Sequence, residues 1–292
     1  MQLKISHTIK QQIARNFSRA AATYNQTAIL QQEVGSRLLE RLDLIKIDPK
    51  IILDMGSGTG FHAEALAKRY PTADILQLDI AKGMIDFSKE SLPSAKQHYV
   101  CADGDYCPLK NHSIDFVFSN CALQWFFDPQ FVLAEMRRIL KPGGLLLFST
   151  YGPDTLKELR DSYAAFDAGD FVNTFLDMHD IGDLCLHADY SDPVMDMETL
   201  TLTYKDVITL LKDLKFMGSQ TIHGAKPRGL ATEGRFARLQ KAYELHLTSS
   251  LILPATFEII YGHAWIPLES PLHRADNNGN IYIPIEHIQY LK

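Results

Sequence analysis

Acidic side chains end several apolar runs in the first half of the chain, and a glycine-rich turn follows the first of them. Asp54 ends one such run, and Gly56, Gly58 and Gly60 follow it in the spacing G-x-G-x-G. Glycine accepts a positive φ and lets a ligand approach the backbone closely, and the helical pattern that follows offers free N–H groups. The segment 51–60 therefore predicts a buried strand, a tight turn and a helix that together bind a ligand.

The residues around this turn indicate which ligand it binds. A carboxylate such as Asp54 would repel a pyrophosphate but could hold an ammonium group, and no Walker-type lysine follows the turn. The spacing also differs from the G-x-G-x-x-G of dinucleotide-binding turns. These features favour a nucleoside with a cationic amino-acid tail, which S-adenosylmethionine is, over another nucleotide or a purely structural turn.

Two further acids follow apolar runs and could bind the nucleoside. Asp79 lies about 20 residues beyond the glycines, where a carboxylate can accept both ribose hydroxyls, and it could also cap the next helix. Asp103, beside the amide of Gly104, could bind the adenine amino group, and Asp105 is the alternative. Met84 lies one turn into the helix after Asp79 and would either support the adenine ring or pack in the core.

The elements that must position these residues alternate regularly up to residue 150. Apolar runs of strand length alternate with helical patterns at 20–30 residues per unit, which is typical of a parallel sheet with helices on both faces. The expected strands are 50–55, 74–79, 98–102, 115–120 and 145–150, and the expected helices are 61–69, one that begins near Lys82, and 129–140. Ligands of such sheets bind at the carboxyl ends of the strands.

The pattern changes after residue 150. Helices are expected at 156–176, from 177, at 205–217 and at 235–246, and strands at 195–204, at 251–265 and as a short edge strand at 281–283. We expect one domain over 1–265, made of N-terminal helices (1–45), a cofactor-binding core (50–150) and lid insertions (152–176 and 205–246), with a C-terminal extension over 266–292.

The composition limits the classes of protein to which the chain can belong. The chain has 292 residues, is 46% hydrophobic and carries a net charge of −6, so a substantial core is expected and nucleic acid is not an expected partner. The cysteines (Cys101, Cys107, Cys121, Cys185) lack metal-type C-x-x-C spacing, so no metal is expected. No apolar run suits a signal peptide or a membrane span, and we expect a cytoplasmic protein with reduced thiols.

The sequence indicates less clearly which residues would bind a second ligand, the molecule that reacts with the cofactor. Phe17 and Tyr24 lie in the N-terminal helical segment and would either pack between helices or face the cofactor and substrate. Between 205 and 241, bases outnumber acids by 8 to 3, as on a solvated helical face, a clamp for an anionic substrate or a dock for an acidic macromolecule.

Several segments of the core resemble the class I S-adenosylmethionine-dependent methyltransferases, namely 52–60, 78–80, 119–125 and 140–144. The resemblance implies a Rossmann-like α/β fold with a seven-stranded, mostly parallel sheet, helices on both faces and a helical lid. It also implies that Ile80, Asn120 and Ala122 join the cofactor site.

Three further segments, 13–24, 150–159 and 228–230, resemble the malonyl-acyl-carrier-protein O-methyltransferases of biotin synthesis. This resemblance implies an enzyme that methylates the free carboxylate of a malonyl thioester, carried by acyl-carrier protein or CoA. The carrier is acidic, which suits the basic segment 205–241. Some members carry arginine where this chain has Thr174, so the cation that meets the substrate carboxylate is left open.

A carboxylate acceptor is already ionised near pH 7, because its reference pKa is about 4, and it needs no general base. The site must still recognise the anion, for which Arg228 is the first candidate, before Arg160 and Lys226. Tyr24 and Trp125 would shield the methyl donor from water.

Other functions remain open at this level. The segments 177–183 and 195–198 resemble assembly factors of mitochondrial complex I, which are methyltransferase-like and linked to arginine hydroxylation. The remaining alternatives are another small-molecule methyltransferase and a non-catalytic protein that binds the cofactor, although the intact acids and glycines argue against the latter.

Overall fold

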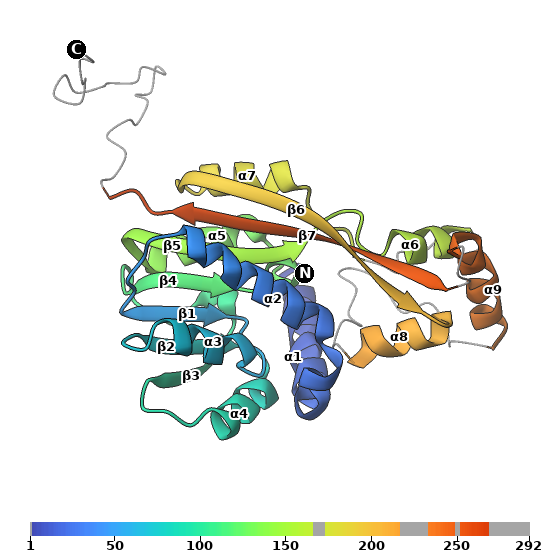
Figure 1. Cartoon of the computed structure of the whole chain (residues 1–292), viewed down its shortest axis with the longest axis horizontal. Helices are drawn as coiled ribbons and strands as arrows, with labels where there is room; N and C mark the ends of the chain where they lie inside the picture. The colour runs from blue at the N-terminus through green and yellow to red at the C-terminus, as the bar shows by residue number, and fades with distance from the viewer. Residues whose placement is uncertain (1, 166–172, 217–232, 249–251, 269–292) are drawn as a thin grey trace, which may run out of the picture.

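The computed structural model describes residues 2–165, 173–216, 233–248 and 252–268. These residues form a seven-stranded sheet in the order β3-β2-β1-β4-β5-β7-β6 (Figure 1). The strands are β1 (Ile51–Met55), β2 (Asp74–Asp79), β3 (Gln97–Cys101), β4 (Ile114–Ser119), β5 (Leu140–Tyr151), β6 (Ser191–Tyr204) and β7 (Leu253–Trp265). Strands β1 to β5 pair in parallel, whereas β7 is antiparallel to both β5 and β6. The predicted sheet is confirmed.

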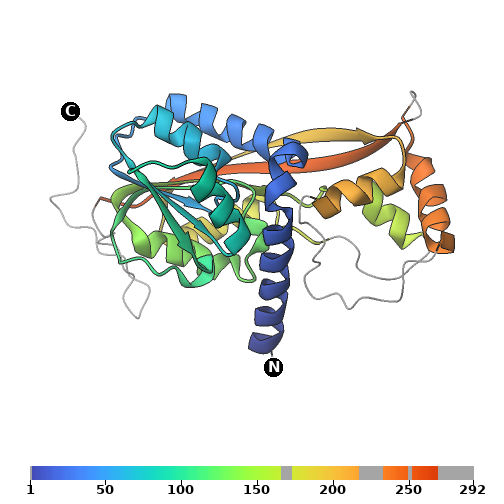
Figure 2. The same ribbon diagram turned by 90° about the horizontal axis from the view of Figure 1, so that it is seen from below.

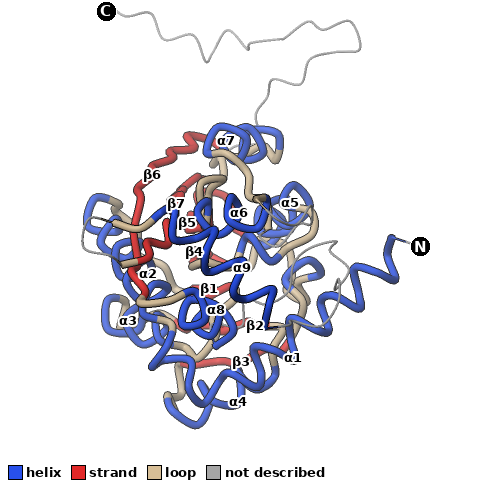
Figure 3. Tube along the Cα trace, turned by 90° about the vertical axis from the view of Figure 1, so that its right-hand side faces the viewer, coloured by secondary structure: helices blue, strands red, loops and turns tan. Residues whose placement is uncertain are grey.

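Helices cover both faces of this sheet. They are α1 (Gln2–Thr27), α2 (Ile29–Glu40), α3 (Phe61–Arg69), α4 (Lys82–Ser91), α5 (Pro129–Ile139), α6 (Lys157–Ala164), α7 (Met178–His187), α8 (Val207–Phe216) and α9 (Glu233–Tyr243). Short 3-10 turns lie at Arg41–Leu44, Gly104–Tyr106, Leu123–Trp125 and Glu244–His246. Helices α2 and α3 pack on one face of the sheet, and α5 and α7 pack on the other (Figure 3).

The core explains why the strands have continuous apolar runs. In β1, Ile52 faces the α2–α3 layer, whereas Leu53 and Met55 face the α5–α7 layer, and none of the three is exposed. A parallel strand between two helical layers is buried on both sides, so it cannot show an alternating pattern.

Some predicted boundaries were wrong. Strand β5 begins at Leu140 and not at residue 145, because Leu140 already pairs with Ile114 of β4; the register then shifts across a segment that contains Gly143, whose φ is +73°, and regular pairing resumes at Leu145. The helix predicted over 156–176 ends at Ala164 in α6, and 173–176 are not helical. The helix predicted from residue 177 is confirmed: the Asp177 carboxylate accepts the His179 N–H and caps α7. The strand predicted at 281–283 lies outside the described residues.

Strands β6 and β7 form a long antiparallel ribbon that extends beyond the parallel strands, and α6, α8 and α9 lie at its far end (Figures 1 and 2). Helix α9 packs against α6 and α8, and α8 also contacts α1. The described helices of the predicted lid insertions, α6, α8 and α9, thus lie beyond the edge at which β1, β4 and β5 end (Figure 1), and their action as a lid stays a prediction. None of the described helices is both long and apolar enough to cross a membrane.

Candidate active site

The glycine-rich turn follows β1 at the point where the strand order of the sheet reverses. Gly56 and Gly58 have φ of +75° and +54°, and the N–H groups of Gly56 and Ser57 donate to the Leu78 carbonyl. A Cβ at Gly56 would lie 2.5 Å from the Cβ of Ala122, which follows β4. Glycine is therefore required at residue 56 both by the conformation and by the close approach of the two loops.

Gly60 serves the packing of the turn. It is the residue that precedes α3, with a φ of +79°, and a Cβ there would lie 2.2 Å from the Ser88 hydroxyl and 2.7 Å from the Gln77 amide oxygen. Gly60 does not line the cavity described below. The sequence placed it with the cofactor residues, whereas the structure places it beneath the turn.

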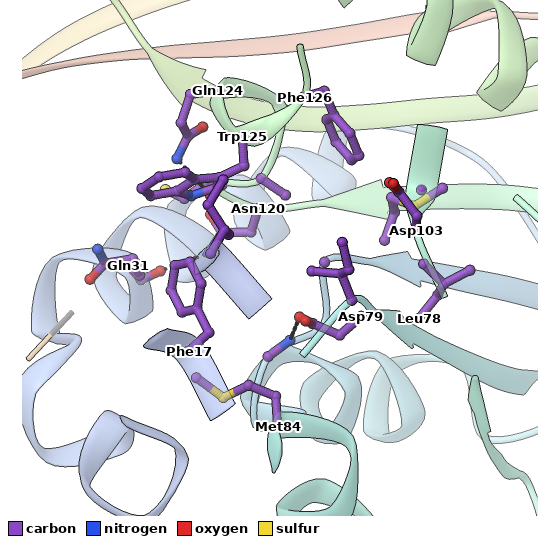
Figure 4. Close-up of a pocket in the computed structure, with 18 of the residues that line it drawn as sticks. Phe17, Gln31, Leu78, Asp79, Met84, Asp103, Asn120, Gln124, Trp125 and Phe126 are labelled. Carbon is purple, nitrogen blue, oxygen red and sulfur yellow. Dashed lines mark hydrogen bonds between the residues drawn. The ribbon is translucent and has the colours of Figure 1, made fainter. Parts of the chain in front are cut away.

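Asp79 connects the turn with the next helix. Its carboxylate accepts the Gly58 N–H at 2.9 Å and the Ala81 N–H at 2.7 Å, so it both orders the turn and helps to start α4 (Figure 4). Burial raises the pKa of this carboxyl, and the two backbone N–H groups partly oppose that rise. Each carboxylate oxygen has a second lone pair, so both can still accept a hydroxyl from a ligand.

Asp54 lies next to this site but does not line the cavity. Its side chain is only 3% exposed, and its carboxylate finds no hydrogen-bond partner in the part of the chain that the structure describes. Burial, and then repulsion from Asp79, raise the pKa of Asp54 to about 8. A buried carboxylate without a partner is costly, and a cationic ligand group would lower that cost.

Helix α1 crosses the site and contributes a contact that the sequence analysis missed. The ammonium of Lys10 lies 2.6 Å and 2.7 Å from the two carboxylate oxygens of Asp103 and also binds Asp105. The Lys10 side chain is only 8% exposed. Lys10 lies one helical turn before the buried Ile13, so a lysine on the same helix face as an apolar residue was the signal available in the sequence.

Aromatic side chains form the wall beneath α1. Phe17 contacts Trp125 edge-on at 5.4 Å between ring centroids and Tyr24 at 6.2 Å (Figure 4). Burial, with the neighbouring Cys121 and Asp79, raises the pKa of Tyr24, so its hydroxyl stays neutral. Met84 is buried against Ala21 of α1, as the packing alternative predicted, and it also lines the cavity, so its contact with an adenine ring stays a prediction.

Polar side chains form the opposite wall, where β4 and β5 end. Asn120 donates to the Gln31 carbonyl at 2.9 Å and accepts the Ser149 hydroxyl at 2.7 Å. The amide of Gln31 donates to the Tyr151 hydroxyl at 3.2 Å. The sequence analysis missed Gln31 and Tyr151, because they are separated by 120 residues and lie in helical and strand patterns that also suit plain packing.

These walls enclose a cavity of about 100 Å³. It brings together most of the predicted site residues: Phe17, Tyr24, Gly56, Gly58, Asp79, Ile80, Met84, Asp103, Gly104, Asn120, Ala122 and Trp125. Arg228 and Lys226 lie outside the described residues. Arg160 does not line the cavity; its guanidinium donates to the carbonyls of Pro153 and Thr155.

The residues of this cavity suit a nucleoside with a cationic tail. Asp79 offers free lone pairs for vicinal hydroxyls, and the glycines leave room that a Cβ would reduce. Asp54, buried next to the cavity but not in its lining, suits a cation. Among the described residues, no group of three or more His, Cys, Asp or Glu side chains is arranged to hold a metal ion.

Comparison with known proteins agrees with this geometry. Residues 53–148 match a family model described as a methyltransferase domain. A protein from Laribacter hongkongensis named malonyl-[acyl-carrier protein] O-methyltransferase is 43% identical, and the match covers 94% of this chain and 95% of that protein. A protein of the same name from Gallionella capsiferriformans is 46% identical, with coverage of 88% and 91%.

Solved structures support the fold. The YcgJ protein of Bacillus subtilis superposes with a TM-score of 0.57 at 13% identity, covering 80% of this chain and 98% of that one. A phosphoethanolamine N-methyltransferase of Haemonchus contortus, solved with S-adenosylhomocysteine, gives a TM-score of 0.50 at 20% identity, covering 80% of this chain and 52% of that one. The fold is therefore that of a Rossmann-like class I methyltransferase, as predicted.

Proposed function

This chain belongs to the malonyl-[acyl-carrier protein] O-methyltransferase family, and we propose that it methylates the free carboxylate of a malonyl thioester on acyl-carrier protein. The observation that carries this proposal is the identity of 43–46% over nearly the whole length of those relatives. The product, a malonyl methyl ester, is the starting unit that the resemblance assigns to biotin synthesis.

The cofactor is S-adenosylmethionine, which supplies an electrophilic methyl group on a sulfonium centre and leaves as S-adenosylhomocysteine when a carboxylate oxygen accepts the methyl. We assign the ribose to Asp79, the adenine to Asp103, Gly104 and Met84, and the ammonium to Asp54. Lys10 pairs with both Asp103 and Asp105 and so ties α1 to the loop at the proposed adenine end.

The remaining residues act on the acceptor by position and not by proton transfer. A carboxylate with a pKa of about 4 is ionised at neutral pH, so the site needs to orient it and exclude water. Tyr24, Gln31 and Tyr151 form the polar lining on the side away from Asp103 and offer neutral hydrogen-bond donors. Phe17 and Trp125 cover this region against water.

A cation for the malonyl carboxylate is still required. Of the described residues that line the cavity, Lys10 is the only base, and its charge is already compensated by two acids. Arg228, which lies outside the described residues, remains our first assignment for this cation. The exposed Arg238 and Lys241 of α9 are consistent with attraction of an acidic carrier protein.

The function is tested by incubating the protein with methyl-labelled S-adenosylmethionine and malonyl-carrier protein. We expect label on the carrier as a base-labile methyl ester, and no label on acetyl-carrier protein, which lacks the free carboxylate. Malonyl-CoA in a parallel reaction shows whether the carrier itself is needed. Cofactor binding without ester formation would contradict the proposal and would favour a methyltransferase-like protein of another activity.

The raised pKa of Asp54 leads to a prediction about proton release. With a pKa of about 8, most of the Asp54 carboxyl is protonated at pH 7 in the free protein. A bound ammonium favours the ionised form, so cofactor binding at pH 7 should release close to one proton, and affinity should rise with pH between about 6 and 7.5. Calorimetry in two buffers of different ionisation enthalpy measures this release.

The control for this prediction is Asp54→Asn, which keeps the shape of the side chain but cannot titrate. Its binding should be weaker and independent of pH in this range, with no difference between the two buffers. Equal binding enthalpies in both buffers for the unmodified protein would show that Asp54 does not exchange a proton with the cofactor.

A further inference from the structure

A second cavity, of about 240 Å³, lies beside the cavity of about 100 Å³ described above, which we call the donor cavity because we assign it to S-adenosylmethionine. Its described lining comes from the turn after β4, the end of β5, the segment 173–176 and the start of α7. Most of the lining is apolar or aromatic, and the polar contributors are Gln124, Thr150 and Thr174. No charged side chain belongs to the described lining, so the cavity suits a neutral ligand with few polar groups.

The two cavities share part of their walls. Gln124, Phe126 and Tyr151 line both of them. Tyr151 turns its hydroxyl toward Gln31 at the donor cavity, and its ring contacts Phe175 of the second cavity edge-on at 5.6 Å. Gln124 donates to the Cys121 carbonyl at 2.6 Å and accepts the Thr150 hydroxyl at 3.1 Å, so its side chain is held in place. Figure 4 shows Gln124 on the wall of the donor cavity.

The other sides of the donor cavity are occupied. Lys10, Asp103 and Asp105 are linked at the adenine end, and the glycine turn forms the floor. Helix α1 covers the site with Phe17 and Tyr24. The wall of Gln124, Phe126 and Tyr151 thus separates the donor cavity from the second cavity.

We propose that the second cavity binds the pantetheine-type arm of the acceptor thioester, so that the acyl group reaches the methyl donor between Gln124 and Tyr151. This inference rests on the proposed function. A malonyl thioester carries its charge at the free carboxylate, whereas the arm behind the sulfur is a neutral chain of methylene and amide groups. The carboxylate therefore suits the polar donor cavity, and the arm suits the uncharged second cavity.

The test uses a substitution that narrows the second cavity at its rim. Leu176 lines it and is 38% exposed, so Leu176→Trp adds bulk without disturbing the core. The matched control is Leu186→Trp, on α7 but outside both cavities and 55% exposed. Calorimetry measures binding of a malonyl-pantetheine analogue in which a hydrolysis-resistant amide replaces the thioester, on protein saturated with S-adenosylhomocysteine.

We expect Leu176→Trp to weaken binding of this probe at least about tenfold, and Leu186→Trp to stay within about twofold of the unmodified protein. Both variants should bind S-adenosylhomocysteine normally, which also shows that they fold. In turnover, the KM of Leu176→Trp should rise for malonyl-carrier protein and for malonyl-CoA alike, because the two share the arm. The KM should change less for the malonyl thioester of N-acetylcysteamine, which lacks most of the arm.

The outcomes separate this inference from the proposed function. Equal probe binding by Leu176→Trp and the unmodified protein would overturn the assignment of the arm to the second cavity, as would a failure of the unmodified protein to bind the probe. Probe binding that depends on Leu176 without any methyl transfer would support the arm site and contradict the proposed reaction.

Discussion

Replacing Asp79 with asparagine should raise the dissociation constant for S-adenosylmethionine at least about a hundredfold. A hydrogen bond to a charged group contributes about 1.5–3 kcal/mol, and two ribose hydroxyls would lose a charged acceptor. One oxygen is also replaced by an NH₂ group, which cannot accept the Gly58 or Ala81 N–H. The turn and the start of α4 thus lose order together with the ligand contact.

Equilibrium binding of S-adenosylmethionine to the purified variant measures this effect. The matched control is Asp86→Asn on α4, the helix that follows Asp79, because the Asp86 carboxylate pairs with Lys82 at the surface. That variant should bind the cofactor like the unmodified protein. Equal affinities for Asp79→Asn and Asp86→Asn would remove Asp79 from the cofactor site.

Replacing Gly56 with alanine should lower the free energy of unfolding by about 2–5 kcal/mol and abolish tight cofactor binding. The positive φ costs a non-glycine residue about 1–2 kcal/mol, and overpacking adds about 1–3 kcal/mol. The added methyl group would lie 2.5 Å from the Ala122 Cβ, and Ala122 itself lines the cavity. Urea unfolding and cofactor titration measure the two effects separately.

Two variants distinguish the steric clash with Ala122 from the backbone strain of the positive φ. Gly58 also has a positive φ, of +54°, but a Cβ there would meet only a Tyr24 ring carbon at 3.9 Å. Gly58→Ala should therefore lower the free energy of unfolding only by the backbone strain, about 1–2 kcal/mol. The double variant Gly56→Ala with Ala122→Gly removes the colliding methyl group and should recover part of the stability. A double variant no more stable than Gly56→Ala alone would show that the collision is not the cause.

The cofactor core could be predicted from the sequence because its signals are local. A buried strand, the acid near its end and the glycines after it are adjacent in the chain, and the parallel sheet brings Asp79 and Asp103 to the same edge. The same reasoning could not separate Gly58, which lines the cavity, from Gly60, which packs on Ser88. Spacing alone does not show which side of a turn faces a ligand.

The contacts between distant segments could not be predicted. Lys10 meets Asp103 across 93 residues, and a charged residue near the start of a helix ordinarily indicates a solvated surface. The lining of the second cavity by Phe175 depends on where α6 ends, and the predicted helix over 156–176 had this end wrong, whereas the start of α7 after Asp177 was predicted. Helix boundaries depend on caps such as Asp177, which compete with continuation of the helix.

The position of β7 between β5 and β6 has a consequence for folding during synthesis. Thr150 of β5 pairs with Ile260 of β7, which is about 110 residues later, so the edge of β5 cannot be covered until nearly the whole chain has left the ribosome. Until then the five parallel strands would present an unpaired apolar edge, which is a template for aggregation. A chain that stops before β7 should therefore form inclusion bodies, even though it retains every residue proposed here to bind the nucleoside.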